Sequence, residues 1–204
     1  MGRKAESNRR EQILDAARLV FKAEGYDRAR VSKIAEAAGV SNGTVYLYFK
    51  SKQDLLEALV NKFKGMMADA LMPAMQNPQT EQALKETVHA AFEVAKRERD
   101  LIVLMDLLYG LTRNFDSIVN PRVMKELRHF IRNRIARGEI RKYHPAMAAA
   151  LVGGLVQFVT KLCLVWKDFD ISQFEDITIS FVRHALLISL ENNTDNYCPQ
   201  KEVR

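Results

Sequence analysis

Hydrophobic residues recur along this chain at intervals of three and four, the spacing that places them on one face of an α-helix. A first helix is predicted between Asn8, which forms a capping-box pattern with Glu11, and the helix-ending Gly25. Two short helices follow, one ending at Gly39 and one covering about 43–49. A longer apolar stripe begins after Ser51 and runs until Pro73. Its length predicts a helix that belongs to two parts of the molecule.

The rest of the chain continues the same periodicity. It predicts five further helices, at about 79–97, 99–113, 120–137, 145–166 and 173–190. No long stretch alternates with period two, as a half-buried strand would. The pattern therefore predicts an all-α protein of about nine helices, with a three-helix head and a helical body.

The segment 146–166 is apolar almost all round, so a membrane span has to be weighed. It is rich in alanine, carries Lys161 well inside, and has no second span to accompany it. A helix of this kind in a globular protein lies in the core or at a dimer interface, and we expect this outcome here. The pair Gly153 and Gly154 is expected to let another helix approach closely.

Charge is distributed unevenly along the 204 residues. Residues 1–64 carry 13 basic and 8 acidic side chains, whereas 65–204 carry 18 and 17. This asymmetry favours a polyanion-binding head on an electrically neutral body, the alternative being an ordinary solvated surface. Two cysteines and an N-terminus without an apolar stretch favour a reducing, cytoplasmic location without a secretory signal.

Residues 31–49, VSKIAEAAGVSNGTVYLYF, have the composition of a helix-turn-helix, in which the second helix enters the DNA major groove. Ala35 and Ala38 are small where two helices cross, Gly39 allows positive φ, and Ser41 can cap the second helix. Asn42 and Tyr46 then face outward toward bases, with Thr44, Tyr48 and Lys52 as phosphate candidates. An ordinary helical hairpin is the alternative.

The sequence resembles the tetracycline-repressor (TetR) family of bacterial transcription regulators. The residues that carry the resemblance are ILDAARLVFKAEGYD and VSKIAEAAGVSNGTVYLYFKSKQDLLEAL. It implies base contacts from Asn42, Gly43, Thr44 and Tyr46, phosphate contacts from Tyr48 and Lys52, and further contacts from Ser32 and Lys33. One position departs from the family: Arg30 stands where Ser or Thr usually caps the second helix. We expect Asp27 to close that end, with Arg30 free to contact phosphate, and the arm containing Arg3, Lys4, Arg9 and Arg10 either to track the DNA or to stay disordered.

The resemblance also implies a division of labour along the chain. Residues 1–52 would bind DNA, 53–191 would bind a ligand and dimerise, and 192–204 would form a flexible tail. The helices at 145–166 and 173–190 would pair with those of a second copy, and a small-molecule effector would displace the long fourth helix and re-space the two heads. An apolar or amphipathic effector is expected, and candidate pocket residues are Phe92, Met105, Asp106, Tyr109, Arg134, Phe158, Lys161 and Trp166.

Other functional classes lack support in the sequence. There is no nucleophile-elbow, P-loop or dinucleotide-binding motif, so no enzyme and no cofactor is expected. The four histidines show no i, i+4 pair and no carboxylate at metal-ligand spacing, so no metal site is expected either. The competing functions are a ligand-independent, architectural DNA-binding protein and an activator of the same family. Specific recognition of a palindromic operator by a repressor is the favoured interpretation.

Overall fold

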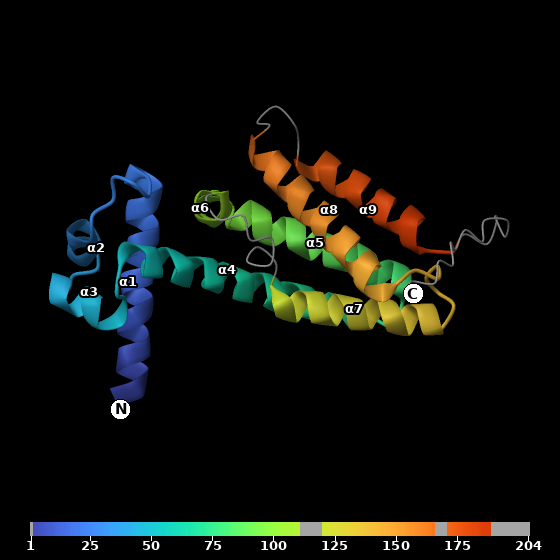
Figure 1. Cartoon of the computed structure of the whole chain (residues 1–204), viewed down its shortest axis with the longest axis horizontal. Coiled ribbons are helices and arrows are strands. Elements are labelled where there is room, and N and C mark those ends of the chain that lie inside the picture. Colours follow the sequence, from blue (N-terminus) through green and yellow to red (C-terminus); the bar gives the residue numbers. More distant parts are fainter. Residues whose placement is uncertain (1, 111–119, 166–170, 189–204) are drawn as a thin grey trace, which may run out of the picture.

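A computed structural model describes the chain apart from residues 1, 111–119, 166–170 and 189–204 (Figure 1). Side chains are described throughout those parts except at 2–5, 105–110, 160, 161, 163–165 and 171. Over the described residues the structure is helical, with one isolated bridge between Ile140 and Leu187 in place of any sheet. The helices are α1 Gly2–Glu24, α2 Val31–Ala37, α3 Asn42–Tyr48, α4 Lys52–Met75, α5 Thr80–Arg97, α6 Arg99–Gly110, α7 Pro121–Ala136, α8 Pro145–Val165 and α9 Ile171–Leu186.

The head consists of α1, α2, α3 and the first half of α4, packed around one apolar core. The predicted turn between α2 and α3 is confirmed, since Gly39 has φ +63° and the small Ala35 and Ala38 are buried. Ser41 caps α3 by accepting a hydrogen bond from the Thr44 backbone N–H at 3.1 Å. The turn chemistry of residues 39–44 therefore sets the angle at which α3 leaves the head.

Helix α4 belongs to both cores. Its first half contributes Leu55, Leu59 and Phe63 to the head core, and its second half contributes Leu71 and Met75 to the body core. The predicted Ser51–Asp54 start is confirmed: Ser51 Oγ accepts from the Asp54 N–H, and the Asp54 carboxylate accepts from the Lys50 N–H. Figure 1 shows α4 as the connection between the head at one end and the body at the other.

The body is built around α5, which packs against α4 on one side and against α8 and α9 on the other. Helix α7 lies against α4 and α8. Gly153 on α8 allows this approach, because a Cβ there would meet Met124 Sδ of α7 at 3.1 Å. The expected close approach at Gly153 is thereby confirmed. None of the described helices combines the length and hydropathy needed to cross a lipid bilayer.

Two expected helix ends were wrong. Helix α1 begins at Gly2, so Asn8 lies inside it and does not cap it. The carboxylate of Glu11 binds Lys62 Nζ of α4 at 2.7 Å instead, a long-range partner that the local pattern does not reveal. Helix α4 continues past Pro73 to Met75, so the proline stands in the last turn and the helix ends two residues after it. The predicted tail, 192–204, lies outside the described residues.

Candidate DNA-binding surface

Helix α3 buries one apolar side chain in the head core and exposes the residues on its opposite side. Val45 is fully buried, whereas Tyr46 is 53% and Leu47 84% exposed, and Asn42 and Gly43 are exposed as well. The exposed side chains of Tyr46 and Leu47 are adjacent on this short helix, so together they offer an apolar contact surface. The residues Asn42, Gly43, Tyr46 and Leu47, all expected to face outward, thus lie together on one surface.

Gly43 is not required by the fold. Its φ is unexceptional for a helix, and an added Cβ would meet only Ser41 Oγ, at the ordinary contact distance of 3.7 Å. Thr44 lies beside it, half-buried, with its hydroxyl 2.9 Å from Ser41 Oγ. The absence of a side chain at Gly43 therefore leaves the backbone of α3 exposed on its outer surface, and the packing of the head does not require it.

The start of α2 contributes three exposed polar residues. Arg30 is at the N-cap and makes no side-chain cap bond, as its chemistry requires. The Asp27 side chain does not replace it; what Asp27 offers is its backbone carbonyl, which accepts from Lys52 Nζ. Lys33 pairs with Glu24 at 2.5 Å, whereas Ser32 has an exposed side chain.

Lys52 and Tyr48, both expected at phosphates, have contacts inside the head. Lys52 Nζ donates to the carbonyls of Tyr26 at 2.7 Å and Asp27 at 3.0 Å, and lies 4.5 Å from the centroid of the Tyr26 ring. It thereby ties the start of α4 to the loop after α1. Tyr48 is half-buried against the head core. In this geometry Lys52 supports the loop that precedes α2, and its ammonium is already satisfied.

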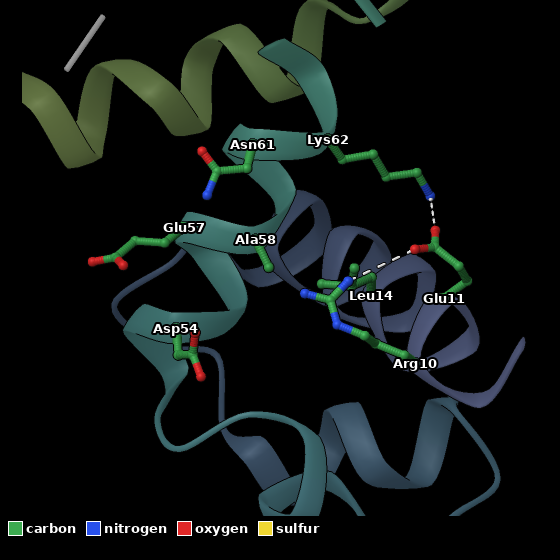
Figure 2. Close-up of a pocket in the computed structure, with 8 residues that line it drawn as sticks. All are labelled: Arg10, Glu11, Leu14, Asp54, Glu57, Ala58, Asn61 and Lys62. Carbon is green, nitrogen blue, oxygen red and sulfur yellow. Dashed lines mark hydrogen bonds and ion pairs between the residues drawn. The ribbon is translucent and has the colours of Figure 1, made fainter. Parts of the chain in front are cut away.

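A polar groove of about 320 Å³ separates α1 from α4 on the side of the head (Figure 2). Lys62 Nζ crosses it to Glu11 at 2.7 Å and Asp15 at 3.0 Å. Burial opposes the charged amine, but these hydrogen bonds outweigh it and raise the pKa of Lys62. The guanidinium of Arg10 lies 5.0 Å from the centroid of Phe49. The groove is lined by Arg10, Glu11, Leu14, Asp54, Glu57, Ala58, Asn61 and Lys62.

A second set of charged side chains joins the head to the body. Arg18 of α1 makes a bidentate contact with Asp100 in the first turn of α6, with both N···O distances 2.6 Å. Its third nitrogen lies 2.9 Å from Oε2 of the buried Glu98, close enough for an ion pair but without hydrogen-bond alignment. The hydrogen bonds with Arg18 lower the pKa of Asp100 and raise that of Arg18, although burial opposes both charges. Because the partners are 82 residues apart, no local pattern predicts this clamp.

The expected ligand residues are not gathered around one cavity of the described structure. Phe92 is fully buried in the body core, whereas Phe158 is 63% exposed on the outside of α8. Arg134 is buried and donates to the carbonyls of Asn77 and Pro78 and to Glu139, so it closes the turn between α4 and α5. It also borders a groove of about 170 Å³ between α4 and α7. The side chains of Met105, Asp106, Tyr109, Lys161 and Trp166 lie outside the described residues.

The expectation about metal-ligand spacing was wrong. His89 and Glu93 lie four residues apart on α5, and their ligand atoms and that of Glu175 on α9 all lie within 4.8 Å of one another. Lys96 Nζ already sits between the two carboxylates, 2.8 Å from Glu93 and 3.1 Å from Glu175. His89 completes the network at 2.5 Å from Glu175. The cluster therefore fastens α9 to α5 with an internal cation.

Comparison with known proteins shows that the helix-turn-helix region is similar to that of bacterial regulatory proteins. The family model described as bacterial regulatory proteins, tetR family, matches residues 13–59. A fatty acid metabolism regulator protein of Bacillus subtilis is 34% identical over 97 residues, which span 47% of this chain and 50% of that protein. This chain therefore aligns with about half the length of that curated relative.

Solved structures extend the similarity over the body. The fatty acid degradation regulator FadR from Bacillus halodurans has a TM-score of 0.72 and 26% identity, covering 84% of this chain and 96% of that one. FadR from Bacillus subtilis, solved in complex with stearoyl-CoA, has a TM-score of 0.73 at 23% identity, with the same coverage. At 23% identity, the similarity to the Bacillus subtilis protein shows the fold alone. Together they extend the agreement from the head to the whole helical arrangement.

Proposed function

Because the chain belongs to the TetR family of bacterial regulatory proteins, we propose that it binds a palindromic operator as a homodimer and represses transcription until a small ligand releases it. The observation that carries the proposal is the outer surface of α3. A buried Val45 and a Ser41 cap fix this helix, and Asn42, Tyr46 and Leu47 project from it unused by the fold.

The chemistry of this surface fits the major groove. The Asn42 amide can pair with an adenine edge, and Leu47 and the Tyr46 ring offer apolar contacts to a thymine methyl. Gly43 lets the backbone come close to the DNA, and the exposed Lys50, Arg30 and Ser32 are available to phosphates around the groove. Lys33 and Lys52 would first have to leave their protein partners, so we assign them smaller contributions.

The proposed homodimer uses the outer faces of α8 and α9. Both helices carry large exposed apolar side chains at the same spacing, four and then seven residues apart: Met147, Leu151 and Phe158 from α8, and Ile177, Phe181 and Ile188 from α9 and the residues after it. Gly154 lies on the same face of α8, with nothing within 4 Å of an added Cβ, so a partner helix has room to approach there. A two-fold copy of this face would bury both rows and present two heads to DNA.

An amphipathic effector is supported by two of the similar proteins, a fatty acid metabolism regulator and a FadR solved in complex with stearoyl-CoA. We therefore choose a long-chain acyl-CoA as the first ligand to test, with free coenzyme A as the control for its headgroup. A ligand of this class would act only if it prefers one spacing of the heads over the other.

Selection of bound sites from random DNA by the purified chain tests the proposal. We expect a palindrome preferred over random sequence by at least about 1,000-fold. Binding without such preference would instead support an architectural DNA-binding protein. Repeating the selection with stearoyl-CoA tests the ligand separately. Unchanged DNA binding would exclude a long-chain acyl-CoA as the effector and would leave the operator proposal intact. A promoter reporter then distinguishes a repressor from an activator.

A further inference from the structure

The near-neutral charge of the body conceals a strongly basic segment. Residues 122–144 contain eight Lys and Arg against two Glu, whereas the rest of 65–204 contains ten against fifteen acidic residues. The basic segment is α7 and the turn after it. Charge concentrated on one helix of the body, away from the helix-turn-helix, has no role in the proposed operator contact.

Three of these cations form a row on the outer face of α7. Lys125, Arg128 and Arg132 are exposed, and within the described part of the chain none of them has an ion-pair or hydrogen-bond partner. At about 1.5 Å rise per residue they lie about 4.5 and 6 Å apart along the axis, within about 60° around it. The row is therefore straight, and like charges have been left side by side at an electrostatic cost.

The buried side of α7 explains why the row is held rigidly. Val123, Leu127, Phe130 and Ile131 anchor the helix to the body core, and Asn120 caps it by accepting from the Arg122 N–H at 2.9 Å. Asn120 also donates to the Lys64 carbonyl of α4 at 2.7 Å. The cations thus project from a helix fixed at its N-terminus and along its length.

We propose that this row, Lys125, Arg128 and Arg132, binds the phosphate backbone of a second DNA segment without regard to sequence, so that one dimer links two duplexes. A lipid surface or a protein partner would need apolar anchors, and none of the large exposed hydrophobic side chains in the described structure lies on α7. A polyanionic backbone needs only cations in a line. The inference rests on the proposed function in one respect: a protein held at an operator is already surrounded by DNA.

The test uses the full chain with its heads saturated by an unlabelled operator fragment, and a labelled 40-base-pair duplex of unrelated sequence as the probe. The wild type is expected to capture the probe, and K125Q/R128Q/R132Q is expected to lose at least about ten-fold of that capture. The slope of log affinity against log salt should fall by about 2 to 3 per subunit. Operator affinity should change less than two-fold.

Lys85 supplies a matched control, because it is an exposed cation on α5 without a partner in the described structure. R128Q alone should weaken probe capture measurably, and K85Q should not. Equal losses from both variants would reduce the effect to net charge and overturn the proposal. Absent capture by the wild type, or stronger capture of polyglutamate than of the duplex, would overturn it too. Failure to bind any operator at all would instead contradict the function proposed above, so the two failures are distinguishable.

Discussion

At Gly43 the fold and the proposed DNA contact make different demands on the same position. The backbone there does not need a glycine, since its φ is not positive and an added Cβ has room against Ser41. Ser41 differs, because its hydroxyl satisfies the Thr44 N–H while the residue also lies beside the exposed surface. These two neighbours allow stability and DNA binding to be separated by single substitutions.

Gly43→Ala is expected to keep or raise stability, by up to about 1 kcal/mol, because alanine favours a helix more than glycine. Operator affinity should nevertheless fall by at least about ten-fold, since the added methyl group stands between α3 and the DNA. Thermal unfolding and a binding titration on the same sample measure both. Unchanged affinity would show that the backbone at residue 43 does not come close to DNA.

Ser41→Ala is expected to destabilise the chain by about 0.5–2 kcal/mol, because it removes the cap of α3. Ser41→Asp is the control, since aspartate also accepts a cap bond and should retain most of the stability. Its negative charge near phosphate should still weaken DNA binding. Denaturant unfolding compares the three proteins, and equal destabilisation by both substitutions would contradict a capping role.

Among the elements, α1 and α6 are connected by an ionic contact that is not needed to form either helix. The Arg18 guanidinium reaches Asp100 and the buried Glu98, while Leu101 and Leu104 of α6 enter the head core. Head and body are therefore held together by ionic as well as apolar contacts, and α6 belongs in part to both.

Asp100→Asn is expected to destabilise the chain by about 1.5–3 kcal/mol near neutral pH, the usual range for a hydrogen bond to a charged group. Because the folded pKa of Asp100 is lowered from 3.8, its contribution is fully present above that value and is lost as pH falls through the folded pKa. Urea unfolding of both proteins between about pH 7 and pH 2 should show the difference shrinking only at the acid end.

Arg97→Met is the control for this clamp. Arg97 also pairs with Glu98, at 2.8 Å, but its side chain is 64% exposed. Such pairs contribute about 0–1 kcal/mol, so the substitution should change stability little. A loss as large as that from Asp100→Asn would mean that Glu98, rather than the bidentate contact, carries the connection.

The sequence predicts those elements whose signals are local. Helix periodicity, the Ser51–Asp54 start and the Gly39–Ser41 turn each lie within a few residues, and each is found in the structure. Partners chosen by packing are not visible in this way. Lys52 binds loop carbonyls, Glu11 binds α4, and Phe158 turns outward, because each outcome depends on segments distant along the chain.

For the whole molecule, the exposed rows on α8 and α9 predict obligatory pairing. Phe181→Glu places a charge in the proposed interface, so this variant should sediment as a monomer at micromolar concentration, where we expect the wild type to be a dimer. Operator affinity should fall by at least about 100-fold, because one head reads only a half-site. Leu19→Glu, at an equally exposed residue of α1, should leave both properties unchanged. A monomeric wild type would contradict this use of α8 and α9.

The length of α4 sets the scale of motion that a regulator of this shape needs. With 24 residues, it is about 36 Å long. A tilt of about 5° at its body end moves its other end by about 3 Å, close to the 3.4 Å that separates successive base pairs. In a dimer, both heads would shift together, so a change in packing too small to disturb either core is enough to put two recognition helices out of step with the turns of the double helix.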